Sequence, residues 1–318
     1  MKYEIEKREK GTFIHFSNKE GFEVTFCDVG ASIYEIKLDG ISLTSSPMDK
    51  DYFVENGYWG KTIGRLSGRT KNAEVDFEGK KYNLPINEGK NSLHGGKEGF
   101  SFKRFDYRIK EDSIVFALVS PAFDQGLPGN VKLEVEYTIK NTILNIELRW
   151  KSDEDTLLNP TIHTYFNLGE KDIKNHLLCL KSSKVSCYDN ELIPTGFVDV
   201  PDYMNFSNLK EIGESMDKDE LKKSKARGID HCYLPEEKAI SLQSKRFRLT
   251  LTSDRPCIQV YSNNYPVDNL LMSGNKLDSR GLSVALEPFI YPNDFYLMKS
   301  KKEVWSKMYI KYEFERIG

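Results

Sequence analysis

The sequence lacks long apolar runs and has no excess of charge of either sign. Its 318 residues include 46 Lys and Arg against 48 Asp and Glu, which gives a net charge of −2 at pH 7. That balance argues against a nucleic-acid partner, which favours a strongly basic surface. No apolar run approaches the ~18 residues of a membrane span, and the segment Met1–Lys7 has none of the apolar character of a signal peptide. We therefore expect a cytoplasmic protein with no nucleic-acid or membrane partner.

Cysteine is also scarce. The five cysteines are scattered, and no two of them form a Cys-x-x-Cys pair: Cys27, Cys179, Cys187, Cys232 and Cys257. This number and spacing predict neither a disulfide framework nor a structural zinc site. In a reducing cytoplasm, such cysteines serve as small, partly buried apolar side chains.

Helical periodicity is weak, whereas apolar and polar residues alternate along much of the chain. Val131 to Ile139 alternates, Lys140–Asn141 follows, and Leu144 to Trp150 alternates again, which predicts a hairpin with one buried face per strand. The same pattern predicts further strands around the turns Asp39–Gly40 and Glu78–Gly79, over residues 247–251 and over residues 308–314.

The best helical candidate is the Lys-rich stretch from Leu209 to Lys223, which we interpret as a short helix or an exposed loop. Strand patterns run from the first residues to the last, with no internal repeat and no low-complexity linker. We therefore predict an all-β protein, a large antiparallel β-sandwich with few short helices, in which residues 1–318 form a single domain. The absence of βαβ alternation argues against a Rossmann or TIM-barrel fold.

The chain has only five histidines, and two of them stand in distinctive blocks. His163 lies in Asn159-Pro-Thr-Ile-His-Thr-Tyr-Phe-Asn-Leu168, where β-branched and aromatic neighbours favour a stiff, extended backbone. His94 precedes two glycines, which allow a close approach of backbone and ligand. Each histidine is open to two interpretations: a structural ring bonded to the backbone, or a general acid or base that titrates near neutrality.

Three further blocks carry groups suited to binding or proton transfer. Gly64–Arg69 holds two arginines, which either lie on the surface or donate a fork of hydrogen bonds to a ligand. Asp230 stands beside a glycine-containing turn, and Glu287 follows four small or apolar residues. A buried glutamate is rare, and burial would raise its pKa toward that of a general base. The loop Phe123–Asn130 is expected at the rim of a site, where it could act as a lid.

Together these blocks resemble the aldose 1-epimerase (galactose mutarotase) family. They come in the family's order and span roughly residues 60 to 290: Gly64-Arg65 through Arg69, Asn87 through Gly96, Leu127 through Asn130, His163 through Leu168, Gly228 through His231, and Leu286 through Pro288. The ordered pair of Leu-His-Gly-Gly and His-Thr-Tyr-Phe-Asn-Leu is highly specific.

The resemblance implies the supersandwich fold of galactose mutarotases and the interconversion of α and β anomers of free hexoses such as galactose or glucose. It implies no metal and no organic cofactor. Glu287 matches the family's general base, which takes the proton of the anomeric hydroxyl, and His163 matches the general acid, which protonates the ring oxygen. A carboxylate and an imidazolium suit these transfers near pH 7. Arg69 and His94 match residues that bind the sugar near the reacting atoms, and Asp230 matches the residue that holds its other hydroxyls.

The chain departs from the family's pattern at two places, Gly68, where many members have asparagine, and the aromatic segment Phe289–Tyr296. The preferred sugar therefore stays open, as does the choice between a monomer and a homodimer.

Three alternatives also stay open. An epimerase of a hexose phosphate would need a cationic cluster, for which the candidates are Arg65, Lys71 and Arg227. A non-catalytic carbohydrate-binding protein would be expected to lack Glu287 or His163, and both are present. A glycosidase would use a carboxylate pair such as Glu287 and Asp230, which leaves the histidine blocks unexplained.

Overall fold

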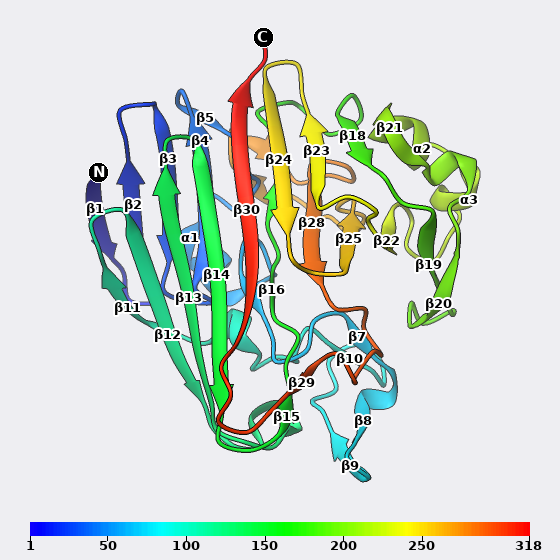
Figure 1. The fold of residues 1–318 in the computed structure, drawn as a ribbon. Helices are drawn as coiled ribbons and strands as arrows, with labels where there is room; N and C mark the ends of the chain where they lie inside the picture. Colours follow the sequence, from blue (N-terminus) through cyan, green and yellow to red (C-terminus); the bar gives the residue numbers. More distant parts are fainter.

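Strands dominate the computed structural model, which describes all 318 residues (Figure 1). The helices are short: α1 (Lys50–Glu55), α2 (Ile212–Met216) and α3 (Asp219–Lys222), with 3-10 turns at Lys71–Ala73, Phe100–Phe102, Asp124–Gly126 and Asp202–Met204. None of these helices has the length and apolar character that crossing a membrane requires. The predicted all-β class with few short helices is confirmed.

One layer of the fold is a nine-stranded antiparallel sheet, whose long central strands cross the front of Figure 1. In spatial order its strands are β11 (Asp106–Ile109), β12 (Ser113–Ser120), β13 (Val131–Lys140), β14 (Ile143–Ser152), β30 (Ser306–Arg316), β24 (Phe247–Ser253), β23 (Ala239–Gln243), β18 (Leu177–Leu180) and β21 (Phe206–Glu211). The predicted hairpin is β13 and β14, which pair from Val131 opposite Ser152 to Lys140 opposite Ile143.

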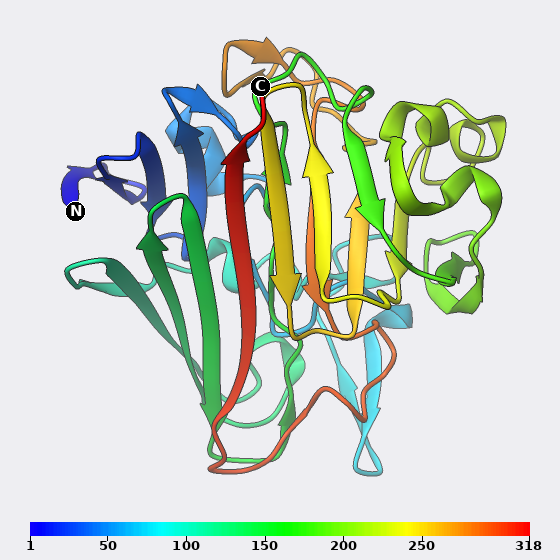
Figure 2. The same cartoon turned by 45° about the horizontal axis from the view of Figure 1, so that its top comes forward.

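The other layer contains two antiparallel sheets, which lie behind the nine-stranded sheet in Figures 1 and 2. The first sheet is β1 (Lys2–Lys7), β2 (Thr12–Ser17), β3 (Phe22–Cys27), β4 (Ser32–Leu38) and β5 (Ile41–Ser42). The second is β17 (Tyr165–Phe166), β28 (Val284–Phe289), β25 (Cys257–Tyr261), β22 (Asp230–Tyr233), β19 (Lys184–Tyr188) and β20 (Pro194–Asp199). A bridge between Thr44 and Phe166 joins the two sheets side by side.

A core of 51 buried apolar residues fills the space between the two layers. The alternation read from the sequence decides which side chains enter it: Val131, Leu133, Val135, Tyr137 and Ile139 of β13 are all buried. Phe26 of the five-stranded sheet packs on Tyr137 with ring centroids 4.7 Å apart. Each such side chain contributes about 1.5–3 kcal/mol through burial. The fold is therefore the predicted large antiparallel β-sandwich.

The same alternation decides what the six-stranded sheet presents on its outer face. Leu286 and Val260 belong to the core, so their chain neighbours Glu287 and Gln259 point to the opposite side. Glu287 on β28 lies directly opposite Gln259 on β25. Asp230 begins the next strand, β22, which pairs with β25. Three polar side chains from three neighbouring strands thus share one face.

Five two-stranded pairs add to these sheets. They are β6 (Thr62–Ile63) with β16 (Thr161–Ile162), β7 (Arg69–Thr70) with β10 (Ser92–Leu93), β8 (Glu74–Phe77) with β9 (Lys80–Asn83), β15 (Thr156–Leu157) with β29 (Lys299–Ser300), and β26 (Leu271–Met272) with β27 (Lys276–Leu277). The predicted hairpin at Glu78–Gly79 is β8 and β9, and the hairpin at Asp39–Gly40 is β4 and β5.

The Lys-rich stretch 209–223 differs from its prediction at its start. Leu209 lies on β21 and is 52% exposed, so it does not share a buried helical face with Ile212 and Leu221. The rest of the stretch forms two helices rather than one, α2 and α3. Lys218 interrupts them because its backbone is extended, with φ −70° and ψ 141°.

Candidate active site

Glu287 and His163 form a buried pair on the outer face of the six-stranded sheet. His163 Nε2 lies 3.2 Å from Glu287 Oε1, and only 4% of His163 and 2% of Glu287 is exposed. Glu287 comes from β28, whereas His163 follows β16. Glu287 Oε2 and His163 Nδ1 are buried and have no hydrogen-bond partner in the protein. Neither of these two atoms is committed to a contact within the protein.

The surrounding chain fixes the His163 ring in place. The backbone N–H of Gly60 donates to the His163 carbonyl over 2.8 Å, and the His163 N–H donates to the Lys61 carbonyl over 3.0 Å. The ring stacks on Tyr165 and Tyr58, with centroids 4.9 and 6.0 Å away. The stiff setting that the sequence predicted for this block is therefore present.

His94 lies beside the pair, with its ring centroid 5.4 Å from that of His163 and the two planes 80° apart. The Gly68 backbone N–H donates to His94 Nδ1 over 3.3 Å, so the proton of the neutral ring belongs on Nε2. Gly95 has φ +83°, and a Cβ there would lie 2.2 Å from the Gly64 carbonyl oxygen. The turn that carries His94 therefore requires glycine at this position.

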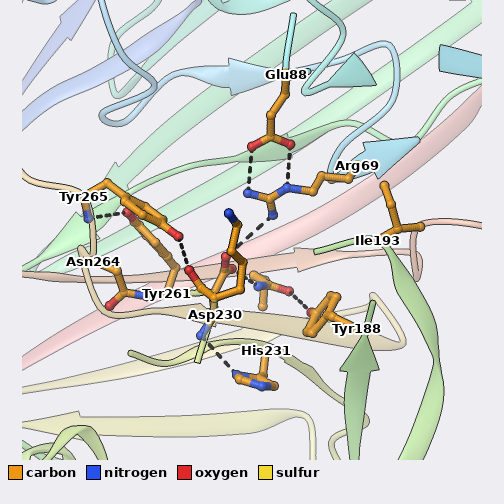
Figure 3. Close-up of polar contacts among 12 residues, drawn as sticks. Arg69, Glu88, Tyr188, Ile193, Asp230, His231, Tyr261, Asn264 and Tyr265 are labelled. Carbon is orange, nitrogen blue, oxygen red and sulfur yellow. Dashed lines mark hydrogen bonds and ion pairs between the residues drawn. The ribbon is translucent and has the colours of Figure 1, made fainter. Parts of the chain in front are cut away.

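Asp230 stands at the centre of a chain of polar contacts (Figure 3). Arg69 Nη1 lies 3.6 Å from Asp230 Oδ2, and the same guanidinium donates to both carboxylate oxygens of Glu88 over 2.7 and 3.0 Å. Gln259 Nε2 donates to Asp230 Oδ1 over 2.6 Å, and Tyr188 donates its hydroxyl to Gln259 Oε1 over 3.4 Å. These contacts hold Asp230 and Arg69 in position before any ligand binds.

Burial shifts the pKa values of Glu287 and His163 in opposite directions. It raises the pKa of Glu287 well above its usual value, and the negative charge of Asp230 raises it further. Burial lowers the pKa of His163 to about 3. A protonated Glu287 beside a neutral imidazole is therefore favoured over an ion pair. The imidazolium expected from the sequence is disfavoured in the free site, because that expectation did not include the desolvation of a buried ring.

Burial and neighbouring charges together shift the pKa values of the three other ionisable groups of the site, His94, Asp230 and Arg69. Burial lowers the pKa of His94 well below its usual value, and the charges of His163 and Arg69 act in the same direction. Burial also raises the pKa of Asp230, against the opposing effect of Arg69. For Arg69, burial lowers the pKa, but Asp230 and Glu88 outweigh it and hold the pKa above its usual value. His94 is thus a neutral donor, and Arg69 is a permanent cation.

These side chains surround an inner cavity of about 70 Å³, which adjoins an outer groove of about 570 Å³. Arg69 and His94 line both spaces. Five aromatic residues line the groove: Tyr58, Trp59, Tyr165, Tyr261 and Tyr265. A polar base with aromatic walls suits a ligand that has many hydroxyl groups and apolar faces.

Comparison with known proteins agrees with this geometry. Residues 12–307 match the family model described as Aldose 1-epimerase. The chain belongs to the aldose 1-epimerase family. The resemblance read from the sequence is therefore confirmed, and so is the expectation of an isomerase with mutarotase activity.

Two relatives support the assignment by sequence, and one solved structure shows the same fold. The chain is 32% identical over 271 residues to the aldose 1-epimerase of Haemophilus influenzae, covering 79% of this chain and 78% of that protein. It is 30% identical over 228 residues to the galactose mutarotase of Sus scrofa, covering 68% of this chain and 65% of that protein. The solved structure of galactose 1-epimerase from Lactobacillus acidophilus superposes with a TM-score of 0.91 at 24% identity, over 100% of this chain and 99% of that one.

The structure brings together the five site residues predicted from the sequence, which all line the inner cavity: Arg69, His94, His163, Asp230 and Glu287. Their individual roles stay predictions. Gln259 and Glu88 also position site residues, although the sequence did not single them out. Gln259 could have been noticed because it is a polar residue between Ile258 and Val260 in a strand of alternating pattern. Glu88 could have been noticed because it lies one residue after Asn87, inside a block already singled out.

Arg65 is fully buried, and all three nitrogens of its guanidinium already donate within the protein, so none is left for a ligand. Its Nε donates to the Ser120 hydroxyl, and its terminal nitrogens donate to five backbone carbonyls, those of Ser120, Pro121, Leu127, Pro128 and Gly129. The loop Phe123–Asn130 is thereby tied down, and it lines neither cavity, so the lid prediction is wrong. Lys71 and Arg227 also lie outside both cavities.

The two departures from the family's pattern meet in the structure. Gly68 has φ +79°, and a Cβ there would lie 2.5 Å from Pro292 Cγ. Pro292 belongs to the aromatic segment Phe289–Tyr296 and lines the inner cavity. The segment therefore occupies the space that an asparagine side chain at position 68 would need, and it gives the cavity an apolar wall there.

The residues best placed to hold a metal ion belong to the same site. One donor atom each of His94, His163 and Glu287 lies within 4.8 Å of the other two. These three side chains come from three separate segments of the chain.

Proposed function

We propose that this protein interconverts the α and β anomers of free hexoses such as galactose or glucose, with Glu287 and His163 as the proton-transfer groups. The observation that carries the proposal is their buried contact of 3.2 Å, at the base of a cavity that also holds Arg69, His94 and Asp230. Anomer exchange needs one group that takes a proton from the anomeric hydroxyl and another that gives a proton to the ring oxygen.

The reaction proceeds through the open-chain sugar. Glu287 takes the proton of the hydroxyl at C1 while His163 protonates the ring oxygen, and the bond between C1 and that oxygen breaks. The aldehyde end rotates about the C1–C2 bond, and closure on the other face, with both proton transfers reversed, gives the other anomer. His94 Nε2–H and the Arg69 guanidinium donate hydrogen bonds near the reacting oxygens, and Asp230 accepts from the more distant hydroxyls. No metal or organic cofactor takes part.

One proton moves between His163 and Glu287 during the reaction, so solvent does not have to restore the protonation state of the pair after each turnover. In the form that opens the ring, the shared proton is on His163 and Glu287 is a carboxylate. After opening, the proton is on Glu287 and His163 is neutral, which is the form that burial favours. Sugar hydroxyls that donate to the carboxylate favour the charged form in the complex. Each transfer contributes roughly 10²–10⁴-fold to the rate.

The alternative functions fit the site less well. A hexose phosphate needs an uncompensated cation beside its phosphate group. In the inner cavity the only cation is Arg69, which is already paired with Glu88 and lies 3.6 Å from Asp230. Lys90 and Lys225 line the outer groove, away from the pair of Glu287 and His163. A glycosidase needs two carboxyl groups on either side of the scissile bond, but Asp230 is engaged by Gln259. A sugar-binding protein without turnover has no use for the buried pair of Glu287 and His163.

We further propose that the protein works in the cytoplasm, as a monomer or a homodimer. All five cysteines are free, which agrees with a reducing compartment. Residues 1–318 are proposed to form one domain, because a core of 51 residues draws on both layers of the sandwich.

Polarimetry on freshly dissolved α-D-galactose and α-D-glucose tests the function. We expect relaxation to the anomeric equilibrium to be much faster with the protein than without it, and the ratio of the two rates ranks the sugars. If neither sugar relaxes faster, the assignment to these hexoses is wrong, and a phosphorylated sugar or another aldose becomes the candidate.

A further inference from the structure

We propose that His94, His163 and Glu287 form an inhibitory binding site for a divalent transition-metal ion such as Zn²⁺. The set of two histidines and one glutamate is a ligand set that zinc accepts while keeping a fourth position open. The binding itself follows from the geometry, whereas its inhibitory effect rests on the proposed function.

The three donor atoms are close enough to converge on one ion. They lie within 4.8 Å of one another, whereas zinc–ligand bonds of ~2.0–2.1 Å in a tetrahedron place donor atoms ~3.4 Å apart. Glu287 and His163 already approach to 3.2 Å, so His94, which is less buried than the pair, makes most of the adjustment. Small rotations of its side chain supply a movement of this size.

An unpaired donor atom is a second, independent sign of a ligand here. Glu287 Oε2 is buried without a hydrogen-bond partner, and only 2% of Glu287 is exposed. A buried oxygen without a partner costs free energy, and a cation bound by the carboxylate removes that cost. His163 would bind the ion through Nε2, the nitrogen that lies 3.2 Å from Glu287 Oε1, and its Nδ1 would then carry the proton of the ring.

Local charge also favours a dication. Arg69 is paired with two carboxyl groups, Glu88 and Asp230, and Glu287 is a third carboxyl group in the same site. Burial keeps a proton on Glu287 in the free site, so a bound cation would replace that proton. The resulting carboxylate would attract the cation strongly, because the cavity has low-dielectric walls. Metal binding has a cost at His94. A neutral ring bound through Nε2 carries its proton on Nδ1, so Nδ1 can no longer accept the 3.3 Å hydrogen bond from the Gly68 N–H.

A bound ion would stop the reaction because it takes both proton-transfer groups. Glu287 could no longer accept the proton of the anomeric hydroxyl, and His163 could no longer protonate the ring oxygen. The ion would also occupy the place of C1 and its hydroxyl, so the sugar and the metal would compete.

Two readouts test the proposal on metal-free protein, prepared by chelation and desalting. Co²⁺ is added while its visible absorption is recorded, and Zn²⁺ binding is measured by calorimetry. We expect one site, the intense band of low-coordinate Co²⁺, and loss of binding by at least about tenfold in Glu287→Gln, His163→Asn and His94→Gln. His15→Asn and Glu23→Gln alter a His–Glu pair of 3.6 Å on the other sheet and serve as matched controls that keep the band.

Equal Co²⁺ binding by the wild type and the three site variants would overturn the proposal, as would the absence of both the band and the heat. Polarimetry then tests inhibition: Zn²⁺ should raise KM and leave kcat unchanged, and excess chelator should restore the rate. A protein that binds Co²⁺ at these residues but turns over neither hexose would refute the proposed function and leave the metal site intact. Full turnover with Zn²⁺ bound at the site would refute the inhibition.

Discussion

Glu287 shows how one strand position produces an unusual carboxyl group. Because Leu286 enters the core, Glu287 must point to the outer face of β28. There it is buried against His163, and burial raises its pKa and lowers that of the imidazole. The pair consequently keeps one proton between its two members over a wide range of pH, which is the state that anomer exchange needs.

The pH profile of kcat/KM reports these shifted values, because it reflects the free enzyme. Below the lowered pKa of His163, about 3, the pair gains a second proton and loses its base. Above the raised pKa of Glu287, the pair loses its only shared proton and with it its acid. We predict a bell whose acid limb lies well below pH 6.5 and whose alkaline limb lies well above pH 4.5. Polarimetry corrected for spontaneous mutarotation measures it, and an acid limb at pH 6.5 would contradict the buried pair.

Asp230 has a different role from the pair, so its loss should have a different signature. It accepts from Gln259 and lies beside Arg69 without touching the proton-transfer atoms. We predict that Asp230→Asn lowers kcat/KM by about 10–100-fold, mainly through KM, because a charge-assisted hydrogen bond is worth about 1.5–3 kcal/mol. Steady-state kinetics on the preferred hexose test this, with the exposed Asp199→Asn as a control. A loss confined to kcat would place Asp230 in the chemistry instead.

At the scale of elements, the site is built where very short strands lie over one face of a longer sheet. Glu287, Gln259 and Asp230 stand on β28, β25 and β22, whereas Arg69 stands on a strand of two residues, β7. His163 directly follows another such strand, β16. Tight backbone pairing, such as that of Gly60 and Lys61 with His163, replaces the length that these strands lack.

Alternation over ten residues was enough to predict β13 and β14, because one buried face repeats five times. Two-residue strands carry no such pattern, so the positions of Arg69 and His163 came from the resemblance of whole blocks. Arg65 could not be placed from sequence, because an arginine beside glycines reads equally well as exposed. Gln259 could not be found for a related reason. The sequence of β25 shows that Gln259 points away from the core, but it does not show that other site residues lie on that face.

Arg65 connects the block Gly64–Arg69 to the segment 120–129, and its substitution tests how much this connection stabilises the protein. It is fully buried and donates to five carbonyls of the segment 120–129. We predict that Arg65→Lys destabilises the protein by about 3–5 kcal/mol, because an ammonium group cannot reach these acceptors together and most stay unpaired. Denaturant unfolding measures the loss against Arg104→Lys, whose side chain is about half exposed. A change below about 1 kcal/mol would show that the segment is held by other contacts.

For the molecule as a whole, the sandwich separates stability from chemistry. The core lies between the two layers, whereas the polar groups of the site lie on the outer face of one of them. Substitutions that keep the volume of a site residue should therefore leave the fold intact. We expect the preferred sugar to depend on residues that line the inner cavity beside the pair, such as Pro292 and Gly68, rather than on Glu287 and His163 themselves.

The most direct test of the account is the polarimetric rate of Glu287→Gln and His163→Asn, measured on the hexose that the wild type turns over fastest. We predict that each variant loses roughly 10²–10⁴-fold in kcat while its circular dichroism and melting temperature stay close to those of the wild type. His15→Asn and Glu23→Gln, the pair 3.6 Å apart on β2 and β3, should keep full activity. A folded Glu287→Gln or His163→Asn variant that keeps most of its activity would contradict the assignment of the pair.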